Sequence, residues 1–230
     1  MLSRLFASGF ALLLLPAAAL TAERPVVVEL FTSEGCSSCP PADAYLTDLS
    51  HAGRDVLPLA FHVTYWNGLG WRDPFSLDAA TQRQARYGSR FGDGSYTPEM
   101  VVDGAHGFVG SERGAVGAAI REARQNRTAA SVSVSRQDGQ ISIAVGAGSG
   151  TGRLLLIGFD TEHRTAVGRG ENTGRTLTES NIVRSIRPVG QWSGAPVTFN
   201  AALPVGQDVA VILEAPDGRI VGATRLGDAS

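Results

Sequence analysis

The sequence has no lysine, and its arginines are not clustered. The 20 basic residues are all arginine, and 22 acidic residues leave a formal net charge of −2 at pH 7. Proteins bind nucleic acid largely by neutralising phosphates with grouped cations. The lack of a basic cluster therefore argues against nucleic acid as a partner.

Long apolar runs are also lacking, except for one at the N-terminus. This run follows the single cation Arg4, is centred on residues 12–15 and ends in small residues at 17–22. Such an order is typical of a secretory signal peptide. The run is shorter than the roughly 20 apolar residues that span a bilayer, so cleavage is favoured over an uncleaved membrane anchor. We expect residues 1–22 to be removed, leaving a periplasmic or secreted chain of bacterial type without a membrane span.

Cysteine is scarce as well, since the chain has only Cys36 and Cys39. A mature chain of about 205 residues can bury most of its surface without support from disulfides. The C-S-S-C spacing therefore indicates a chemical use: either a small exchangeable disulfide or a site for a soft metal. No cofactor is expected, because the glycine-rich residues 168–175 lack the G-x-G-x-x-G spacing of nucleotide-binding loops.

The order of apolar patterns divides the chain near residue 128. Residues 23–128 read as β-α-β-α-β-β-α, an α/β pattern, and residues 129–230 read as short strands joined by glycine-rich turns. We expect the second part to be a mainly antiparallel, sandwich-like β domain, or an extension packed on the first. The strands expected there are 131–135, 141–145, 153–159, 181–186, 197–203, 209–214 and 220–225.

The two cysteines follow an apolar strand that begins at Val26 and precede a helix that starts with two prolines. We expect the first turn of this helix to hold both sulfurs. Unpaired backbone N–H groups and the positive end of the helix dipole stabilise a thiolate there and lower the cysteine pKa. Cys36 is therefore the expected nucleophile and Cys39 the more buried, resolving thiol. Ser37 and Ser38 could add hydroxyl donors.

A second expected site position is Thr97-Pro98, which opens the strand of a hairpin before the last helix of the first part. Local sequence alone favours an ordinary trans proline, because few X-Pro bonds are cis. Together with a C-x-x-C at the start of the first helix, however, the arrangement resembles the thioredoxin superfamily. We therefore expect a cis Pro98 beside the cysteines.

Four separated motifs make the resemblance narrower: VELFTSEGCSSCPPAD, AFHVTYWNGLGW, YTPEMVVDG and GENTGRTLTESNIVR. Together they resemble a bacterial secreted thioredoxin-like family known only as a domain of unknown function. The resemblance implies a thioredoxin-like fold in a periplasmic setting, with Cys36, Cys39 and Pro98 as redox and substrate-strand positions. It implies no activity.

The chain departs from thioredoxin at two positions. Gly35 stands where an aromatic residue usually precedes the nucleophile, and Leu30 stands where a buried acid usually lies. Glu29 is one residue away and should face the other side of the sheet. These differences put a thioredoxin-type proton relay in doubt.

Several other side chains are candidates for the same site. Trp66 and Trp71 could form an apolar patch for a partner protein, with Thr97 and Arg175 as further substrate-binding residues, or the tryptophans could simply pack under a long loop. Arg169, Glu171 and Asn172 share the glycine-rich loop of Arg175, and we hypothesise that this loop approaches Cys36.

The alternative function, metal binding, depends on His62. It is either a hydrogen-bonded core histidine or the third ligand of a Cys2His site for copper or zinc. The leading hypothesis is a periplasmic thiol-disulfide oxidoreductase whose partners are protein disulfides or thiols and a redox partner protein. The alternative is a metal-binding module or metallochaperone. A third reading is a binding module in which the disulfide is merely structural.

Overall fold

A computed structural model describes residues 24–126 and 130–227. The expected signal peptide and the expected boundary near residue 128 lie outside these residues. Within them the protein is mostly β, with three helices: α1 (Pro40–His51), α2 (Asp78–Phe91) and α3 (Arg113–Ala123). None of the described helices is long and apolar enough to cross a membrane.

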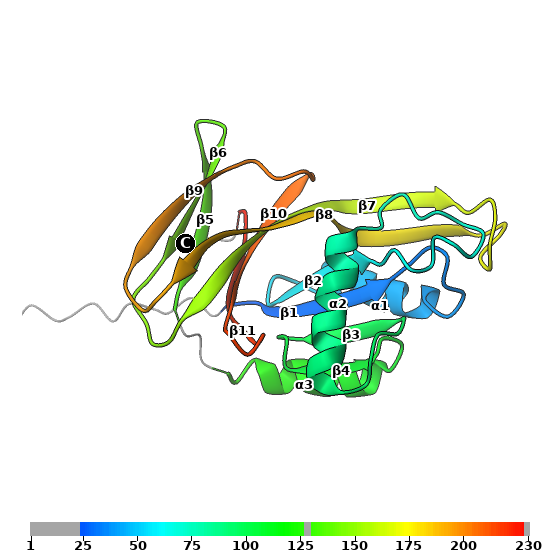
Figure 1. Ribbon diagram of the computed structural model, residues 1–230, viewed down its shortest axis with the longest axis horizontal. Coiled ribbons are helices and arrows are strands. Elements are labelled where there is room, and N and C mark those ends of the chain that lie inside the picture. Colours follow the sequence, from blue (N-terminus) through cyan, green and yellow to red (C-terminus); the bar gives the residue numbers. More distant parts are fainter. Residues whose placement is uncertain (1–23, 127–129, 228–230) are drawn as a thin grey trace, which may run out of the picture.

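The strands form one mixed eight-stranded sheet and one sheet of three strands (Figure 1). The large sheet has the order β11-β10-β7-β8-β2-β1-β3-β4, and the small one has the order β5-β6-β9. Strand β2 runs parallel to both β1 and β8, and the remaining neighbours are antiparallel. The strands are β1 (Val26–Thr32), β2 (Val56–His62), β3 (Glu99–Val102), β4 (His106–Val109), β5 (Val132–Gln137), β6 (Gln140–Val145), β7 (Gly152–Ala166), β8 (Thr176–Trp192), β9 (Val197–Ala202), β10 (Asp208–Glu214) and β11 (Ile220–Arg225).

The first half has the element order that the sequence predicts, and β1 shows how its layers form. Successive side chains of a strand point to opposite faces of the sheet. Val27 and Phe31 pack on the face covered by α2, whereas Val28 and Leu30 pack on the face covered by α1 and α3. Both faces are apolar, so β1 is buried throughout. Each fully buried side chain of this size contributes about 1.5–3 kcal/mol.

Glu29 faces the α2 side of the sheet, as the alternation predicts. Its carboxylate accepts two hydrogen bonds from the buried guanidinium of Arg83 on α2. Arg83 also donates to Glu214 on β10, with an N–O distance of 2.6 Å. This ion cluster joins an element of the second half to two elements of the first.

The second half continues the sheet of the first half. Strand β8 pairs with β2, with Ala60 opposite Ile182. The small sheet packs on the outer strands of the large one around a third core that includes Ile141, Leu156 and Trp192. The arrangement is sandwich-like, with one layer drawn from the sheet that both halves share.

Strands β7 and β8 are much longer than the sequence predicts. They pair from Gly152 opposite Trp192 to Ala166 opposite Thr176, and so form an arm that runs from the sandwich to the start of α1 (Figure 1). The outer part of this arm is mostly polar, with β7 largely exposed and β8 partly buried, and it therefore lacks the apolar alternation that marks a strand in sequence. Its strands are stabilised by pairing with each other.

Candidate functional site

The cysteines lie just before α1 rather than within its first turn, which corrects the sequence-based expectation. Cys39 is the N-cap, and Pro40 and Pro41 occupy the first two helical positions. Proline suits these positions because their N–H groups have no intrahelical partner. The backbone N–H of Cys39 instead donates to the carbonyl of Cys36, which closes a turn between the two cysteines.

Cys36 and Cys39 form a disulfide with an S–S distance of 2.07 Å. Both residues are completely buried, although Ser37 and Ser38 between them are exposed. The hydroxyl of Ser38 lies 3.3 Å from the Cys36 sulfur. Ser38 thus occupies the donor position expected for it, while the backbone N–H of Ser37 is directed to Glu171.

The loop between β7 and β8 covers the disulfide. The Asn172 side-chain amide is fully buried and donates to the carbonyls of Glu34 and Cys36, both at 2.9 Å. Glu171 accepts the N–H of Ser37 at 3.1 Å. The predicted approach of this loop to Cys36 is therefore confirmed. Arg175 contacts the cysteine segment only through Asn172, to whose side-chain oxygen it donates.

Thr97-Pro98 lies at the same edge of the sheet as the cysteine turn. The peptide bond between the two residues is cis, as the sequence predicts. Phe31 pairs with Glu99, so Pro98 lies one residue beyond this pair, level with the end of β1 that leads to Cys36. Pro98 is buried.

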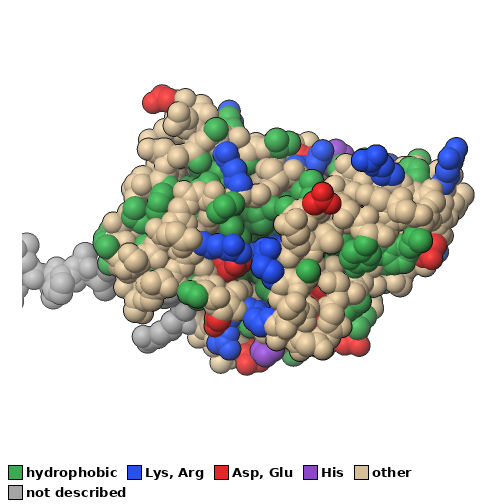
Figure 2. Space-filling view, viewed as in Figure 1, with side chains coloured by type: hydrophobic (Ala, Val, Ile, Leu, Met, Phe, Trp, Pro, Cys, Tyr) green, Lys and Arg blue, Asp and Glu red, His purple; other side chains and the backbone are tan. Residues whose placement is uncertain are grey.

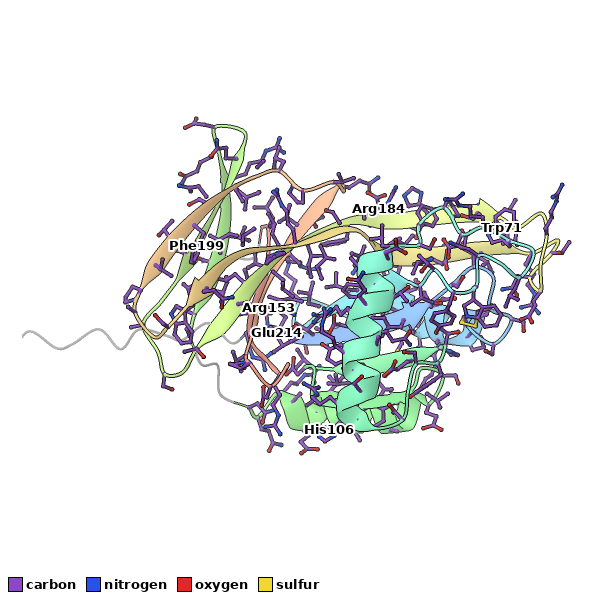
Figure 3. All side chains as sticks on the ribbon, in the orientation of Figure 1. Trp71, His106, Arg153, Arg184, Phe199 and Glu214 are labelled. Carbon is purple, nitrogen blue, oxygen red and sulfur yellow. A yellow bond between two sulfur atoms is a disulfide. The ribbon has the colours of Figure 1, made fainter. Side chains whose placement is uncertain are left out.

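The two candidate tryptophans are each held by a hydrogen bond to a residue near the cysteine turn. Trp66 Nε1 donates to the hydroxyl of Thr97 at 2.8 Å, and Trp71 Nε1 donates to the carboxylate of Glu34 at 2.7 Å. Both rings are partly exposed. Figure 3 places Trp71 at the opposite end of the molecule from Phe199 of the small sheet. The tryptophans therefore combine loop packing with an accessible ring surface.

A cluster of buried carboxyl groups surrounds His62 behind the disulfide. His62 Nδ1 lies 2.7 Å from Asp73, and Nε2 lies 3.7 Å from Glu179. Asp43 accepts the Thr32 hydroxyl at 2.7 Å. The fourth carboxyl group of the cluster belongs to Glu34, which is also fully buried.

The cluster shifts the pKa values of its members. Burial alone would lower the pKa of His62, but the charges of Asp73 and Glu179 outweigh it and raise this pKa to about 10. Burial raises the pKa of Asp43 to about 7 and that of Glu179 to about 8. No described donor reaches either carboxylate oxygen of Glu179, which favours its protonated form. The cluster therefore holds protons near neutral pH.

These acids were missed in the sequence, although one of them carried a signal. Asp43 lies four residues after Cys39, and residues at this spacing share one face of a helix. Asp43 is a buried acid on the helix, whereas the strand position considered above holds Leu30. Asp73 and Glu179 come from a loop and from the distant arm, and no local pattern connects them with the cysteines.

The geometry does not support the metal-binding alternative through His62. Both ring nitrogens face carboxyl groups, and the two sulfurs are bonded to each other. In residues 24–126 and 130–227 no three histidine, cysteine, aspartate or glutamate side chains are arranged to hold a metal ion. His62 is thus a buried, hydrogen-bonded core histidine, which the sequence offered as the alternative to a metal ligand.

Fold and site together define a mostly β protein with a buried C-x-x-C disulfide just before a helix. A cluster of buried carboxyl groups lies near this disulfide, and a long hairpin covers it. The chain belongs to the family described as "Protein of unknown function (DUF1223)", whose family model matches residues 27–214. The matched range includes the cysteines and the covering arm.

Two solved structures resemble the chain. A crystal structure of a protein from Agrobacterium tumefaciens is 32% identical, with a TM-score of 0.76, and the match covers 89% of this chain and 95% of that one. HBP35 of Porphyromonas gingivalis is 14% identical with a TM-score of 0.62, covering 88% and 74% of the respective chains, and is similar in fold alone. A comparison with curated proteins found no match.

Proposed function

We propose that the protein is a thiol-disulfide oxidoreductase that works outside the cytoplasm, with a thioredoxin-like first half. The observation that carries the proposal is the Cys36–Cys39 disulfide before α1, with a proton-holding acid cluster behind it. Because the described residues contain no other thiol, the pair exchanges with an external dithiol or disulfide. The N-terminal signal sequence supports an exported setting.

The proposed reaction transfers two electrons in two exchange steps. In the reduced protein, the Cys36 thiolate attacks one sulfur of a substrate disulfide, forming a mixed disulfide and releasing the first substrate thiolate. The Cys39 thiolate then attacks the Cys36 sulfur, which closes the protein disulfide and releases the second substrate thiolate. The substrate is reduced as the protein is oxidised, and the reverse sequence oxidises a substrate dithiol.

Asp43 is the proposed proton acceptor for Cys39. The resolving thiol must lose its proton before it attacks. Asp43 lies one helical turn beyond Cys39, and its pKa of about 7, raised by burial, suits a group that takes and returns a proton near neutral pH. Thr32 fixes the carboxyl group through its hydroxyl.

The partly exposed rings of Trp66 and Trp71 are the proposed contact surface for a substrate. Thr97 and Pro98 provide the backbone beside the cysteine turn, and Trp66 is anchored to Thr97. Since both cysteines are fully buried, the loop that holds Asn172 has to move before a substrate sulfur reaches Cys36. Arg175 acts on this loop through Asn172.

Insulin reduction tests the proposal. The wild-type protein should catalyse the reaction with dithiothreitol as electron source, and Cys36→Ser should abolish catalysis. Cys39→Ser should instead accumulate a mixed disulfide through Cys36, visible by mass spectrometry. Asp48→Asn changes an exposed residue of the helix that follows the cysteines, and this control variant should stay active. Equal rates for wild type and Cys36→Ser, in both insulin reduction and oxidative refolding of a reduced protein, would exclude the proposed activity.

The reduction potential of the pair decides the direction of electron flow. Known C-x-x-C proteins range from about −270 mV for reductants to about −120 mV for oxidants. A value below about −300 mV would instead indicate a structural disulfide. Equilibration with glutathione or dithiothreitol buffers measures this potential directly.

A further inference from the structure

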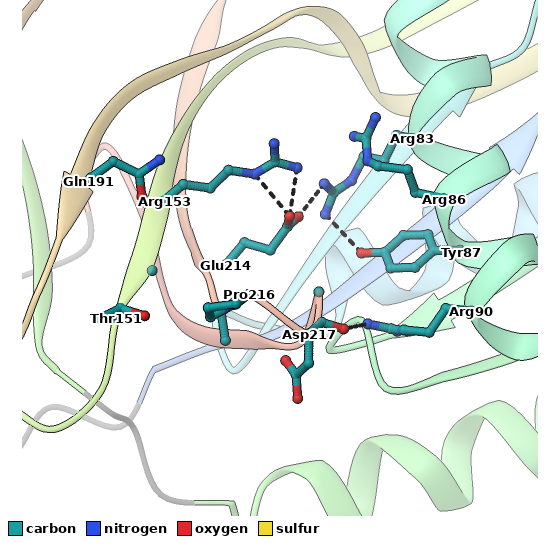
Figure 4. Close-up of a pocket in the computed structure, with 13 residues that line it drawn as sticks. Arg83, Arg86, Tyr87, Arg90, Thr151, Arg153, Gln191, Glu214, Pro216 and Asp217 are labelled. Carbon is teal, nitrogen blue, oxygen red and sulfur yellow. Dashed lines mark hydrogen bonds and ion pairs between the residues drawn. The ribbon is translucent and has the colours of Figure 1, made fainter.

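A polar pocket lies far from the disulfide, where the two halves meet. It has a volume of about 490 Å³ and lies between α2, the first residues of β7 and the turn from β10 to β11. Figure 4 shows four arginines around it: Arg83, Arg86 and Arg90 of α2 and Arg153 of β7. In Figure 2, basic side chains gather around an acidic one near the centre of this face.

Two of the arginines are held by a single carboxylate. Glu214 accepts hydrogen bonds from Arg83 on one oxygen and from Arg153 on the other. Arg83 is buried and also binds Glu29 and the Tyr87 hydroxyl. The guanidinium of Arg83 is therefore taken up by contacts that stabilise the fold. The Arg153 side chain, in contrast, is 35% exposed and reaches the pocket.

The other two arginines have no carboxylate within contact distance. Arg86 forms no hydrogen bond or ion pair with any residue of the described ranges. Arg90 donates to the backbone carbonyl of Asp217 and stacks on the rings of Tyr87 and Phe91. The Asp217 carboxylate points away from Arg90 in Figure 4. Arg86 and Arg90 thus line the pocket as exposed residues, and neither forms an ion pair with a carboxylate of the described residues.

The arginines of α2 also lie close enough to repel one another. Arg83, Arg86 and Arg90 follow each other at spacings of three and four residues, which places like charges on one face of α2 and destabilises a helix by about 0.2–0.5 kcal/mol for each pair. Burial and the charges of Arg83 and Arg153 lower the pKa of Arg86. Two carboxylates, Glu29 and Glu214, contact these four guanidinium groups. The Asp217 carboxylate also lines the pocket but pairs with Arg219, so two positive charges are left.

We propose that this pocket binds a small oxyanion with two negative charges, carried on phosphate or carboxylate groups. A guanidinium presents planar pairs of N–H donors that match such groups. Arg86 and Arg90 bind the anion directly, and Arg153 contributes the N–H groups that Glu214 does not use. The pocket volume lies in the range of small-molecule sites. The proposal concerns a site separate from the disulfide and does not depend on thiol chemistry.

Calorimetric titration of the mature chain with pyrophosphate and, separately, with citrate tests the proposal. We expect one saturable site for at least one of the two anions. If only pyrophosphate binds, the natural ligand carries phosphate groups. If only citrate binds, the ligand carries carboxylate groups. If both bind with similar affinity, the site recognises the paired negative charges that the two anions share. Arg86→Gln and Arg90→Gln should each weaken binding about tenfold or more, because each removes a charge-assisted hydrogen bond.

Arg136→Gln is the matched control. Arg136 is an exposed arginine of the small sheet, and its substitution changes the net charge by the same amount. We expect its affinity to stay within about twofold of wild type at physiological salt, where exposed distant charges are screened. The proposal is wrong if neither anion binds at millimolar concentration, or if Arg136→Gln weakens binding as much as Arg86→Gln. Thermal melts check that the variants are folded.

Discussion

Single buried residues determine how this protein responds to pH. Asp43 and Glu179 keep protons well above the usual pKa of a carboxyl group because they are buried, and His62 stays cationic because carboxyl groups flank it. Folded and unfolded chains therefore bind different numbers of protons between about pH 4 and pH 10. Stability falls as the pH rises through this range.

Replacing Asp43 by Asn should make stability less dependent on pH. The Asp43 pKa is about 7 in the folded protein against 3.8 for the free side chain, so the folded state holds a proton that the unfolded state has released. Wild-type stability should decline from pH 4 to pH 7, by up to a few kcal/mol at about 1.4 kcal/mol per pKa unit. Asp43→Asn lacks this decline and should be the more stable protein at pH 8. Melting temperatures at pH 5 and pH 8 measure the difference.

Asp48→Asn serves as the control for this experiment. Asp48 lies on the same helix but is exposed and paired with Arg113. Its substitution should leave the pH dependence of the melting temperature unchanged. Parallel wild-type and Asp43→Asn curves would contradict the assignment of this titration to Asp43.

His62→Gln should destabilise the protein by about 3 kcal/mol at pH 7, because it leaves Asp73 as a buried charge without its cation. The folded pKa of His62 is raised to about 10, so the stabilisation is complete below pH 6.5 and is lost as the pH rises through 10. The difference from wild type should therefore shrink above pH 10. Urea denaturation measures both effects.

The partly exposed His163, paired with Asp160, supplies the comparison for His62. His163→Gln should cost less than about 1 kcal/mol. A similar loss for both variants would mean that His62 is not stabilised by its buried carboxyl partners. Because His62→Gln weakens the fold itself, loss of metal binding in this variant would not identify His62 as a ligand.

At the scale of elements, the hairpin of β7 and β8 controls access to the cysteines. Asn172→Ala removes two hydrogen bonds that hold the loop on the cysteine turn. At about 1 kcal/mol net for each bond, the open state should gain at least tenfold in population, and dithiothreitol should reduce the disulfide faster by a similar factor. Alkylation followed by mass spectrometry gives the rate.

Thr173→Ala provides the control in the same loop. Thr173 is exposed, and its hydroxyl bonds only within the loop, to the carbonyl of Gly170. Its reduction rate should match that of the wild type. Equal rates for Asn172→Ala and Thr173→Ala would show that the loop does not limit access.

The elements that the sequence predicted well are those whose pattern is local. Strand β1 is a continuous apolar run of strand length and helix α2 ends at a glycine, Gly92, and the order of the first half follows from such local signals. The outer arm of β7 and β8 could not be found in this way, because its polar residues are ordered by pairing and by contact with the cysteine turn. The cysteine pair was evident from spacing, whereas Glu179 joins it only through the path of this arm.

For the molecule as a whole, the shared sheet means that the first half has no complete core of its own. Leu57 and Phe61 of the first half pack in one cluster with Leu155 and Ile157 of the second. Without the second half, strand β2 would also have an unpaired edge where β8 now lies. The sequence showed a change in pattern near residue 128 but could not show that one sheet crosses it, because strand pairing across such a distance leaves no local pattern.

A fragment of residues 24–126 should therefore not fold cooperatively, whereas residues 24–227 should unfold in a single transition. Scanning calorimetry and near-ultraviolet circular dichroism of both proteins provide the test. A sharp transition and a structured aromatic spectrum for the short fragment would show that the first half is an autonomous domain.

The cover of the disulfide has a consequence for the order of events during biosynthesis. Asn172 follows Cys36 by 136 residues, so both sulfurs emerge from the ribosome long before the amide that encloses them. The bond can therefore form in an exported chain that is still unfolded, before the hairpin encloses it. In the finished protein the hairpin has to lift for reduction and for reoxidation alike, so the loop slows both directions, and the first oxidation should be faster than any later one.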